Sequence, residues 1–503
     1  MIVKTYGAAL TGIEAIPIRI ETSIETGINF MMVGLPDNAV KESHFRIATA
    51  LAHCGYRIPN KKIVINLAPA DLKKEGSAYD LTLATGILAA SEQINNKDTG
   101  DYLIMGELSL DGYLQPIRGA LPIAIEAKKQ DFKGVILPVQ NVNEAAMVEG
   151  LPVYGAAHLK EVIDFFDGKN TFVPHRFTAP ENLYGTTETN IDFCDVKGQM
   201  QAKRALEVAA AGGHNILLVG TPGSGKTLLA KRLSGILPPL TKEEQLETTK
   251  IYSVSGKLQQ HNALITCRPF RSPHHTISYT ALVGGGSYPM PGEISLAHNG
   301  VLFLDELPEF SRKTIEVLRQ PLEDGRVQIS RAKMNVSYPS DFMFVASMNP
   351  CPCGYYGATG HTCTCKPNQL LQYRGKISGP LYDRIDLQVQ VSAVTYEEIS
   401  DTKTSGDSSE VIRSRVIAAR NIQYERFAGT GIHSNSQMNC NELRKYCILP
   451  SQGRVLMKKT MEHYMLSGRA HDRILKVART IADLDGSEAI NEIHLSEAIH
   501  YRL

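Results

Sequence analysis

The sequence lacks long hydrophobic runs. The longest candidate, residues 81–90, is much shorter than the roughly 18 apolar residues that a membrane-spanning helix needs, and it contains threonines. The first ten residues also lack a basic segment followed by an apolar stretch, so we expect no secretory signal. These absences predict a cytoplasmic protein without a membrane partner.

A large excess of charge of one sign is also missing. Lysine and arginine total 53 and aspartate and glutamate total 52, which excludes a histone-like polycation and an acidic disordered tail. Residues 1–190 are net acidic and residues 191–503 are net basic. An anionic partner is therefore expected at the C-terminal part, although this excess alone is weak evidence.

The cysteines do not form an even set. Nine in a chain of 503 residues favour a reducing compartment over a disulfide framework. Four of them are grouped as Cys351-Pro-Cys353 and Cys363-Thr-Cys365, and four thiolates on two short turns can surround Zn²⁺ tetrahedrally. His361 is a reserve ligand. The alternative is a flexible loop (351–365) with free, redox-sensitive thiols.

The chain is long enough for roughly three domains, and its patterns predict an α/β fold. Residues 1–170 alternate strand-like with helix-like runs, and periodicity fades over a predicted linker at 171–190. A second α/β segment covers 191–398, an exposed connection is expected at 402–409, and residues 410–503 are helix-rich. In the first segment, strands are expected at 16–20, 62–66 and 134–137 and helices at 40–54, 79–91 and 122–130. In the last segment, helices are expected at 411–427, 440–446, 451–464, 469–484 and 494–501.

A glycine-rich pattern lies between an apolar strand at 215–219 and a helix at 228–237. In such a loop the backbone N–H groups approach phosphates, the lysine reaches the β- and γ-phosphates, and the threonine is a ligand of Mg²⁺. This pattern predicts ATP with Mg²⁺ as cofactors. The residues are Gly220, Thr221, Pro222, Gly223, Ser224, Gly225, Lys226 and Thr227.

Two later strands lead to polar residues. The strand at 301–304 ends in Asp305 and Glu306, a pair suited to the Mg²⁺ shell and to activation of the attacking water. The strand at 342–347 leads to Asn349, which is suited to sensing the γ-phosphate and orienting water. Solvated turns are the alternative at both places.

Basic residues downstream are candidates for completing this site. Arg384 fits an arginine finger supplied by a neighbouring subunit, or else a surface ion pair to Asp383 or Asp386. Arg469 and Arg473 open a helix, and either one can reach the γ-phosphate from a helical lid. The alternative for these two is a solvated helix end.

Several stretches resemble the YifB/ComM family of Mg-chelatase-like AAA+ ATPases. They are Arg-Pro-Phe-Arg-Ser-Pro-His-His (268–275), Leu-Val-Gly-Gly-Gly (282–286), the segment 291–306 and Leu-Arg-Gln-Pro-Leu-Glu (318–323). The resemblance implies a P-loop AAA+ core with a C-terminal helical lid, assembled into a ring that is expected to be a hexamer. It also implies a helicase that acts on single-stranded or branched DNA and drives branch migration in recombination during natural transformation.

The family pattern assigns roles to single residues. Residues 220–227 match its Walker A motif, Asp305 and Glu306 its Walker B motif, and Asn349 its sensor 1. Arg384 matches the arginine finger and Arg469 the sensor-2 arginine, which acts on its own or on a neighbour's nucleotide. The rival interpretation is a partner-directed remodelling or metal-chelatase-type motor that does not translocate on DNA.

Residues 326–338 alternate polar with apolar residues around a basic centre, which predicts a β-hairpin with Arg331 and Lys333 near its tip. In related rings such a hairpin lines the central pore, where cations hold the phosphates of DNA. An ordinary hairpin with solvated charges is the alternative. The glycines of the stretch 279–289 predict a mobile loop that forms a second pore element.

Residues 75–81, 106–117 and 134–138 resemble the Lon protease domain, which predicts a Lon-protease-like α+β fold for residues 1–170. Lon uses a serine–lysine dyad. The serine position falls on Asp80 and the lysine position on Ile123, so the dyad is absent. Ser77 and Lys128 lie nearby if the register shifts, which leaves proteolysis as a minor alternative.

Overall fold

A computed structural model of the protein describes residues 2–95, 98–169, 172–177, 192–258, 263–286, 288–331, 334–358, 361–394 and 406–502. Among these residues, no helix combines the length and apolar character that crossing a membrane requires. Most of the predicted linker at 171–190 lies outside the described residues, and so does Lys333. All nine cysteines are free thiols.

The chain forms two compact units. The first contains Met1–Leu183 and Gln245–Ile265, and the second contains Tyr184–Glu244 and Thr266–Leu503. A piece of the segment predicted as the second α/β domain thus packs with the first unit. The C-terminal helices belong to the same unit as the second sheet, with which they share one hydrophobic core.

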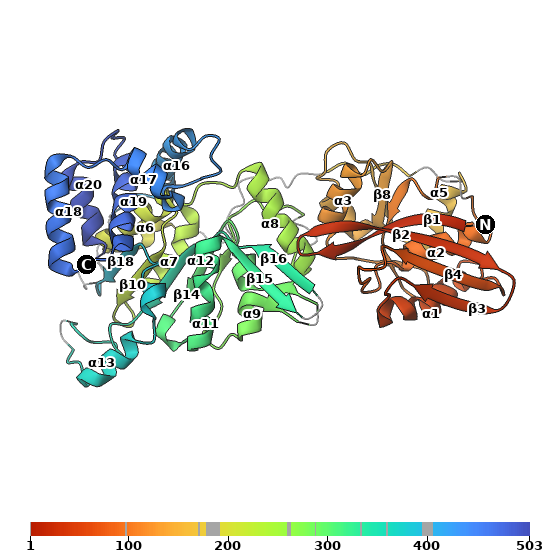
Figure 1. Ribbon diagram of the computed structural model, residues 1–503, viewed down its shortest axis with the longest axis horizontal. Coiled ribbons are helices and arrows are strands. Elements are labelled where there is room, and N and C mark those ends of the chain that lie inside the picture. The colour runs from red at the N-terminus through yellow and green to blue at the C-terminus, as the bar shows by residue number, and fades with distance from the viewer. Residues whose placement is uncertain are drawn as a thin grey trace. The chain divides into compact units, whose positions relative to one another are not determined.

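The first unit is built on a mixed seven-stranded sheet with the strand order β3-β4-β2-β1-β5-β8-β9 (Figure 1). β2 is antiparallel to β1 and β4, and the other neighbouring pairs are parallel. The strands predicted at 16–20, 62–66 and 134–137 are present within β2, β4 and β8. The bounds are Ile2–Thr11 (β1), Glu14–Glu25 (β2), Asn29–Val33 (β3), Lys62–Ala68 (β4), Tyr102–Ile104 (β5), Gly134–Pro138 (β8) and Val153–Ala156 (β9), with a separate small sheet of Glu107–Leu108 (β6) and Leu114–Gln115 (β7).

One helix of this unit is buried on every side. All 11 residues of α2 (Asp80–Ala90) are buried, and the helix packs against β1 and β2. A helix that is apolar all round belongs in a core, so the apolar run at 81–90 is explained by α2. The other helices are α1 (Asn38–His53), α3 (Ala120–Lys129), α4 (Val142–Ala145), α5 (Leu159–Phe166) and most of α8 (Lys242–Ser255).

The second unit contains a parallel five-stranded sheet with the order β11-β14-β17-β10-β18. β10 carries the glycine-rich loop at its C-terminal end, and β17 lies between β10 and β14. Ligands of open α/β sheets bind beyond the carboxyl ends of the strands, so this order brings three predicted site segments to one edge. The bounds are Ile216–Gly220 (β10), Phe270–Arg271 (β11), Val301–Leu304 (β14), Met343–Met348 (β17) and Leu387–Val391 (β18).

Short helices and two hairpins complete this α/β part. Gly284–Gly285 (β12) pairs with Met290–Pro291 (β13), and Arg326–Arg331 (β15) pairs with Met334–Pro339 (β16). The stretch 279–289, predicted as a loop, therefore begins with a helical turn and a short strand. The helices are α6 (Met200–Gly212), α7 (Lys226–Arg232), α9 (Tyr279–Val283), α10 (Glu293–Leu296), α11 (Arg312–Glu316), α12 (Pro321–Asp324), α13 (Pro367–Arg374) and α14 (Gly379–Tyr382).

The C-terminal residues form the predicted group of helices, in which α19 packs against α6, α16, α17 and α20 (Figure 1). Two of the predicted helices, 440–446 and 451–464, have the bounds that the structure shows. The helices are α16 (Ser409–Arg426), α17 (Cys440–Tyr446), α18 (Ser451–Tyr464), α19 (Gly468–Leu484) and α20 (Glu492–His500).

The predicted exposed connection at 402–409 is wrong at its last residue, and residues 402–405 lie outside the described part. Ser409 begins α16 and is buried. Its hydroxyl accepts a hydrogen bond from the N–H of Phe193 (2.9 Å), and its N–H donates to Asp192 (2.8 Å). The polar residue type suggests a loop, but the hydroxyl and N–H of Ser409 form hydrogen bonds with a segment that is far away in the sequence.

A buried ion cluster joins α16 and α19. The carboxylate of Asp483 is inaccessible to solvent and accepts hydrogen bonds from Arg426 (2.7 Å), Arg479 (3.1 Å) and Asn435 (2.7 Å). Arg479 is almost completely buried as well. A buried carboxylate is tolerated when it is paired and hydrogen-bonded, so this cluster specifies how the two helices dock.

Candidate nucleotide site

The glycine-rich loop between β10 and α7 borders open space. Gly223 and Gly225 have φ angles of +77° and +87°, and a Cβ atom added at either position would meet no atom within 4 Å. Glycine adopts this left-handed conformation without steric cost. The hydroxyl oxygen of Ser224 is buried and, within the described residues, has no hydrogen-bond partner. A phosphate group fits such a loop, because it fills space and accepts hydrogen bonds.

Lys226 is held by its own loop. Its ammonium donates to the carbonyls of Gly220 and Thr221, both at 2.8 Å, and to the side-chain oxygen of Asn349 at 3.2 Å. Burial lowers the pKa of Lys226, and the charge of Asp305 opposes that shift. The ammonium therefore lies against the backbone of the loop and next to Asn349, the residue predicted to sense the γ-phosphate.

The end of β14 places a carboxylate beside the loop. Asp305 accepts a hydrogen bond from the hydroxyl of Thr227 at 2.6 Å, and its other oxygen accepts from the hydroxyl of Ser347 and the N–H of Glu306. The Oγ1 atom of Thr227 and the Oδ2 atom of Asp305 are close enough for one Mg²⁺ to bind both. Ser347 and Glu306 fix the orientation of that carboxylate.

Glu306 follows in a left-handed backbone conformation with φ +53°. This conformation is uncommon for a residue with a side chain and is typical of functional sites. Its side chain is exposed, and in the described part of the chain its carboxylate makes no hydrogen bond or ion pair. A carboxylate in that condition can accept a proton from water.

The register of β17 explains how Asn349 reaches this place. Met348 pairs with Val219 of β10, while Ala346 pairs with Leu304 of β14. The residues that follow these pairs therefore leave the sheet side by side. The structure thus gathers Lys226, Thr227, Asp305, Glu306 and Asn349 at one edge.

Arg384 lies elsewhere in the unit. Its guanidinium is paired with Glu323 and donates to the carbonyl of Pro380 (2.8 Å). It lines a cavity of about 460 Å³ together with residues of α9, α11 and α12. The alternative of an ion pair to Asp383 or Asp386 is wrong, because these carboxylates pair with Arg502 and Arg473 instead.

Arg469 and Arg473 differ in their surroundings. Arg473 is paired with the buried carboxylate of Asp386; burial raises the pKa of that carboxyl, but Arg473 and His214 hold it below its usual value. Arg469 is exposed in the first turn of α19 and, among the described residues, has no ion-pair partner. Of the two, Arg469 is the residue available to a nucleotide.

The predicted hairpin is formed by β15 and β16. Arg331, in the last residue pair before the turn, is exposed, and Lys333 lies outside the described residues. Near the other end, Tyr338 is buried and donates to the carbonyl of Pro289 (2.6 Å); burial raises its pKa to about 12. The hairpin is thus anchored at its base, with a cation near its tip.

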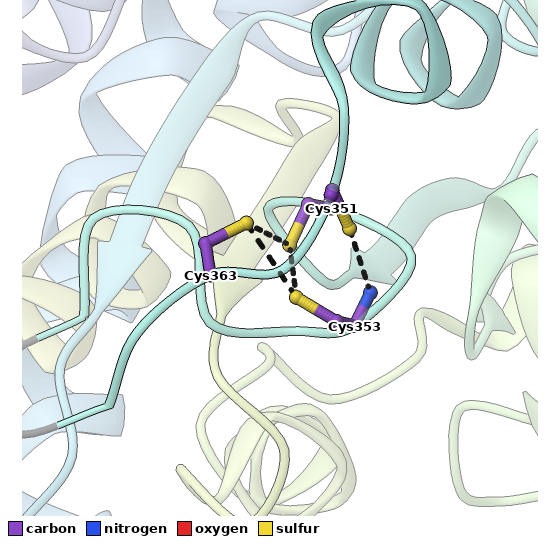
Figure 2. Close-up of side chains that lie close together, drawn as sticks. Cys351, Cys353 and Cys363 are labelled. Atoms are coloured by element: carbon purple, nitrogen blue, oxygen red, sulfur yellow. Dashed lines mark hydrogen bonds between the residues drawn. The ribbon is translucent and has the colours of Figure 1, made fainter.

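The four clustered cysteines converge, as Figure 2 shows for three of them. Sulfur–sulfur distances are 3.3 Å (Cys351–Cys353), 3.5 Å (Cys353–Cys363) and 3.8 Å (Cys351–Cys363), and all four sulfurs, including that of Cys365, lie within 4.8 Å of one another. Hydrogen bonds from backbone N–H groups lower the pKa of Cys353 to about 5. The ring of His361 lies against Tyr355 and is not part of this group.

The positions of the Lon dyad hold residues that cannot form one. Asp80 is buried and accepts hydrogen bonds from Arg46 at 2.7 and 2.8 Å, while burial raises its pKa to about 6. Ile123 is part of the hydrophobic core. An aspartate paired with an arginine and a buried isoleucine offer neither a hydroxyl nor an amine for such a dyad.

Ser77 and Lys128, the alternative serine–lysine pair in a shifted register, form hydrogen bonds to other residues. The hydroxyl of Ser77 donates to Glu107, and the ammonium of Lys128 donates to the backbone carbonyl of Glu149 (2.7 Å). A lysine activates a serine only within hydrogen-bond reach. These contacts do not support the protease alternative.

Comparisons with known proteins identify the family of the chain. Three families match: "Magnesium chelatase, subunit ChlI" at 192–399, "Subunit ChlI of Mg-chelatase" at 20–141 and "Magnesium chelatase, subunit ChlI C-terminal" at 406–502. YifB of Salmonella typhimurium is 44% identical over 98% of this chain and 96% of its own, and YifB of Escherichia coli is 45% identical over the same shares. The competence protein ComM of Haemophilus influenzae is 43% identical over 99% of this chain and 96% of its own.

The chain belongs to the YifB/ComM family of Mg-chelatase-like proteins. Membership of the YifB/ComM family makes it an AAA+-type ATPase, for which ATP and Mg²⁺ are the implied cofactors. The groups that converge at the edge of the sheet fit a nucleotide with its magnesium ion, since they include a lysine, a hydroxyl–carboxylate pair and an open glycine loop.

Sequence reasoning missed two residues that contact side chains predicted to act in this YifB/ComM protein. Ser347 orients Asp305, and its signal is that it is the one polar side chain in the otherwise apolar β17. Glu323 holds Arg384, and no local pattern connects these two residues, which lie 61 positions apart. A partner such as Glu323, which is distant in the sequence, can be identified only from the folded structure.

Proposed function

We propose that the protein is a ring-shaped, ATP-hydrolysing motor that moves on DNA and promotes branch migration in recombination, as in natural transformation. The observation that carries the proposal is the shared edge where Lys226, Thr227, Asp305, Glu306 and Asn349 meet, because phosphoryl transfer to water needs these groups. The DNA part rests on the exposed Arg331 of the β15–β16 hairpin and on the name of ComM as a competence protein.

Each residue of the edge has a separate role. Magnesium bound with ATP supplies charge neutralisation at the phosphates. Thr227 and Asp305 hold it, and Lys226 exchanges its carbonyl contacts for the β- and γ-phosphates. Glu306 orients the attacking water and accepts its proton, and Asn349 orients the same water from the neighbouring strand.

A ring completes the site. Arg384 has no contact with the glycine-rich loop of its own chain among the described residues, so we assign it to the nucleotide of the next subunit. Arg469, on the exposed first turn of α19, contacts a nucleotide from the lid. By family resemblance the ring is a hexamer, and it acts in the cytoplasm without a membrane partner. Zn²⁺ at the four cysteines is proposed as a structural cofactor.

DNA should stimulate the ATPase. We expect ATP turnover of the purified protein at low salt to rise several-fold with single-stranded or four-way-junction DNA, because DNA in the pore organises the subunits that share each site. Glu306→Gln is the control, since it keeps the size of the side chain but removes the base, and it should show no turnover with or without DNA. Turnover that is present yet indifferent to DNA would contradict the DNA proposal.

The hairpin gives a sharper test of the DNA contact. Arg331→Ala should lower DNA-stimulated turnover and make the fall of DNA affinity with salt less steep, while basal turnover stays the same, because one phosphate contact is removed. Arg326→Ala is the matched control: it removes an exposed arginine from the same strand, at the end opposite the turn. Equal effects of the two variants would remove the hairpin tip from the DNA path.

A second candidate is a partner-directed remodelling or metal-chelatase-type motor without DNA translocation. It is favoured by the descriptions of the matching families, all three of which name a magnesium chelatase subunit. The same ATPase groups serve either motor, so the two differ only in what enters the ring. Turnover that ignores DNA in the assay above would favour this candidate.

A further inference from the structure

The cysteine cluster has the dimensions of a metal site. Four sulfurs bound tetrahedrally to Zn²⁺ at about 2.3 Å lie about 3.8 Å from one another, and the three measured separations are 3.3, 3.5 and 3.8 Å. Backbone N–H groups also point at the sulfurs, from Tyr356 to Cys351 (3.3 Å) and from Cys353 to Cys365 (3.4 Å). Donors of this kind stabilise thiolates, so the cluster fits a thiophilic divalent cation.

The turn that carries the first two cysteines is joined to the nucleotide site through the chain. Cys351 is completely buried and lies two residues after Asn349. The side-chain oxygen of Asn349 is 3.2 Å from the ammonium of Lys226. A change in the position of Cys351 is therefore transmitted over two peptide units to a residue that contacts the phosphate-binding lysine.

A second junction is made by packing. Gly354 closes the turn with a hydrogen bond from its N–H to the carbonyl of Cys351 (3.0 Å) and has a φ of +87°. A Cβ atom added at Gly354 would lie 2.6 Å from both Cγ and Cδ of Pro222. The backbone of the cysteine turn thus lies directly against the third residue of the glycine-rich loop.

We propose that the four cysteines bind Zn²⁺ and that the metal-loaded turn holds the phosphate loop in its binding shape through Pro222 and Asn349. The inference rests on the proposed ATP binding at this loop. Loss of the metal releases the turn, moves Pro222 and Asn349, and weakens nucleotide binding. The cysteines thereby make the ATPase dependent on metal supply and on the oxidation state of four thiols.

The first test uses the unaltered full-length chain. Metal content is measured by mass spectrometry, and affinity for a fluorescent ATP analogue is measured for zinc-loaded, chelator-stripped and zinc-restored protein. We expect about one Zn²⁺ per chain, a dissociation constant that rises at least about tenfold on stripping, and recovery on restoration. Equal affinity with and without zinc overturns the inference while nucleotide binding and the proposed function stand. A chain that takes up no zinc overturns the inference and the zinc assignment, while nucleotide binding and the proposed ATP-hydrolysing motor stand.

A pair of glycines provides the second test. Gly354→Ala should weaken nucleotide binding by about tenfold with zinc retained, because the new methyl group collides with Pro222. Gly357→Ala is matched to it, since Gly357 is in the same loop with φ +75° and a Cβ there would meet nothing within 4 Å. Both substitutions carry the left-handed backbone cost, but only the first changes the contact. Equal affinities in the two variants would contradict the coupling.

Nucleotide binding and its coupling to zinc are separated by these measurements. A zinc-loaded wild-type chain that does not bind the ATP analogue overturns the proposed function, and the inference with it. A chain that binds ATP but shows no response to zinc removal or to Gly354→Ala overturns the inference alone. If Gly354→Ala does not fold, the zinc-stripping comparison decides, because it contains no substitution.

Discussion

Arg384→Ala is expected to lower ATP turnover by about 10³- to 10⁵-fold, which is the effect of an arginine finger in related nucleotide hydrolases. Nucleotide binding should stay close to that of the wild type, because Arg384 contacts Glu323 and Pro380 and none of the described loop residues 220–227. Steady-state turnover and the affinity for a fluorescent ATP analogue measure the two effects separately.

Two controls decide whether this arginine acts across a subunit boundary. Arg319→Ala removes an arginine that lines the same cavity and pairs with Glu316 (3.0 Å), and it should leave turnover nearly unchanged. Mixing Arg384→Ala subunits with Glu306→Gln subunits should restore turnover above either variant alone, since some interfaces then combine an intact Arg384 with an intact Glu306. No recovery in the mixture would place the arginine in its own subunit's site.

Asp483→Ala should have the largest effect on stability. Its carboxylate lies between Arg426 and Arg479, and removing one partner of a buried charge pair costs about 3–5 kcal/mol, because the remaining charges are left uncompensated. Urea denaturation followed by circular dichroism should show that loss in the free energy of unfolding. The cluster lies where α19 packs against α16.

Asp472→Ala is the matched comparison for that prediction. Asp472 is on the same helix α19, but its side chain is 45% exposed and its contact is to the neighbouring His471. Exposed ion pairs contribute about 0–1 kcal/mol, so this variant should unfold almost as the wild type does. Similar losses in both variants would mean that the buried cluster contributes no more to stability than an exposed ion pair does, because alanine favours the helix at both positions.

Short-range patterns predict the candidate nucleotide site well because its parts lie at the ends of strands. Parallel strands bring their carboxyl ends to one edge, so an apolar run followed by Asp305 or by Asn349 is enough to place both residues near Lys226. The C-terminal helices are predicted for a similar reason, since helical periodicity in 440–446 and 451–464 is local information.

Other contacts join residues that lie far apart in the sequence. Gly354 meets Pro222 across 132 positions, Arg384 meets Glu323 across 61, and Ser409 meets Asp192 across 217. Each of these pairs depends on how whole elements pack. Composition predicts an exposed loop at Ser409, which is buried. A serine that forms a hydrogen bond with a distant backbone group cannot be told from a loop serine by composition.

The hydrogen bonds of Lys226 have a consequence for the timing of catalysis. Its ammonium donates hydrogen bonds to the carbonyls of Gly220 and Thr221 and to the amide oxygen of Asn349. A phosphate that binds in the loop competes with these oxygens for the ammonium. When the ammonium binds the phosphate, its hydrogen bond to Asn349 is broken as well. Under the proposed function, binding of a nucleotide by the loop and release of Asn349 are then one event, so the proposed water-orienting amide becomes available only when a nucleotide is bound.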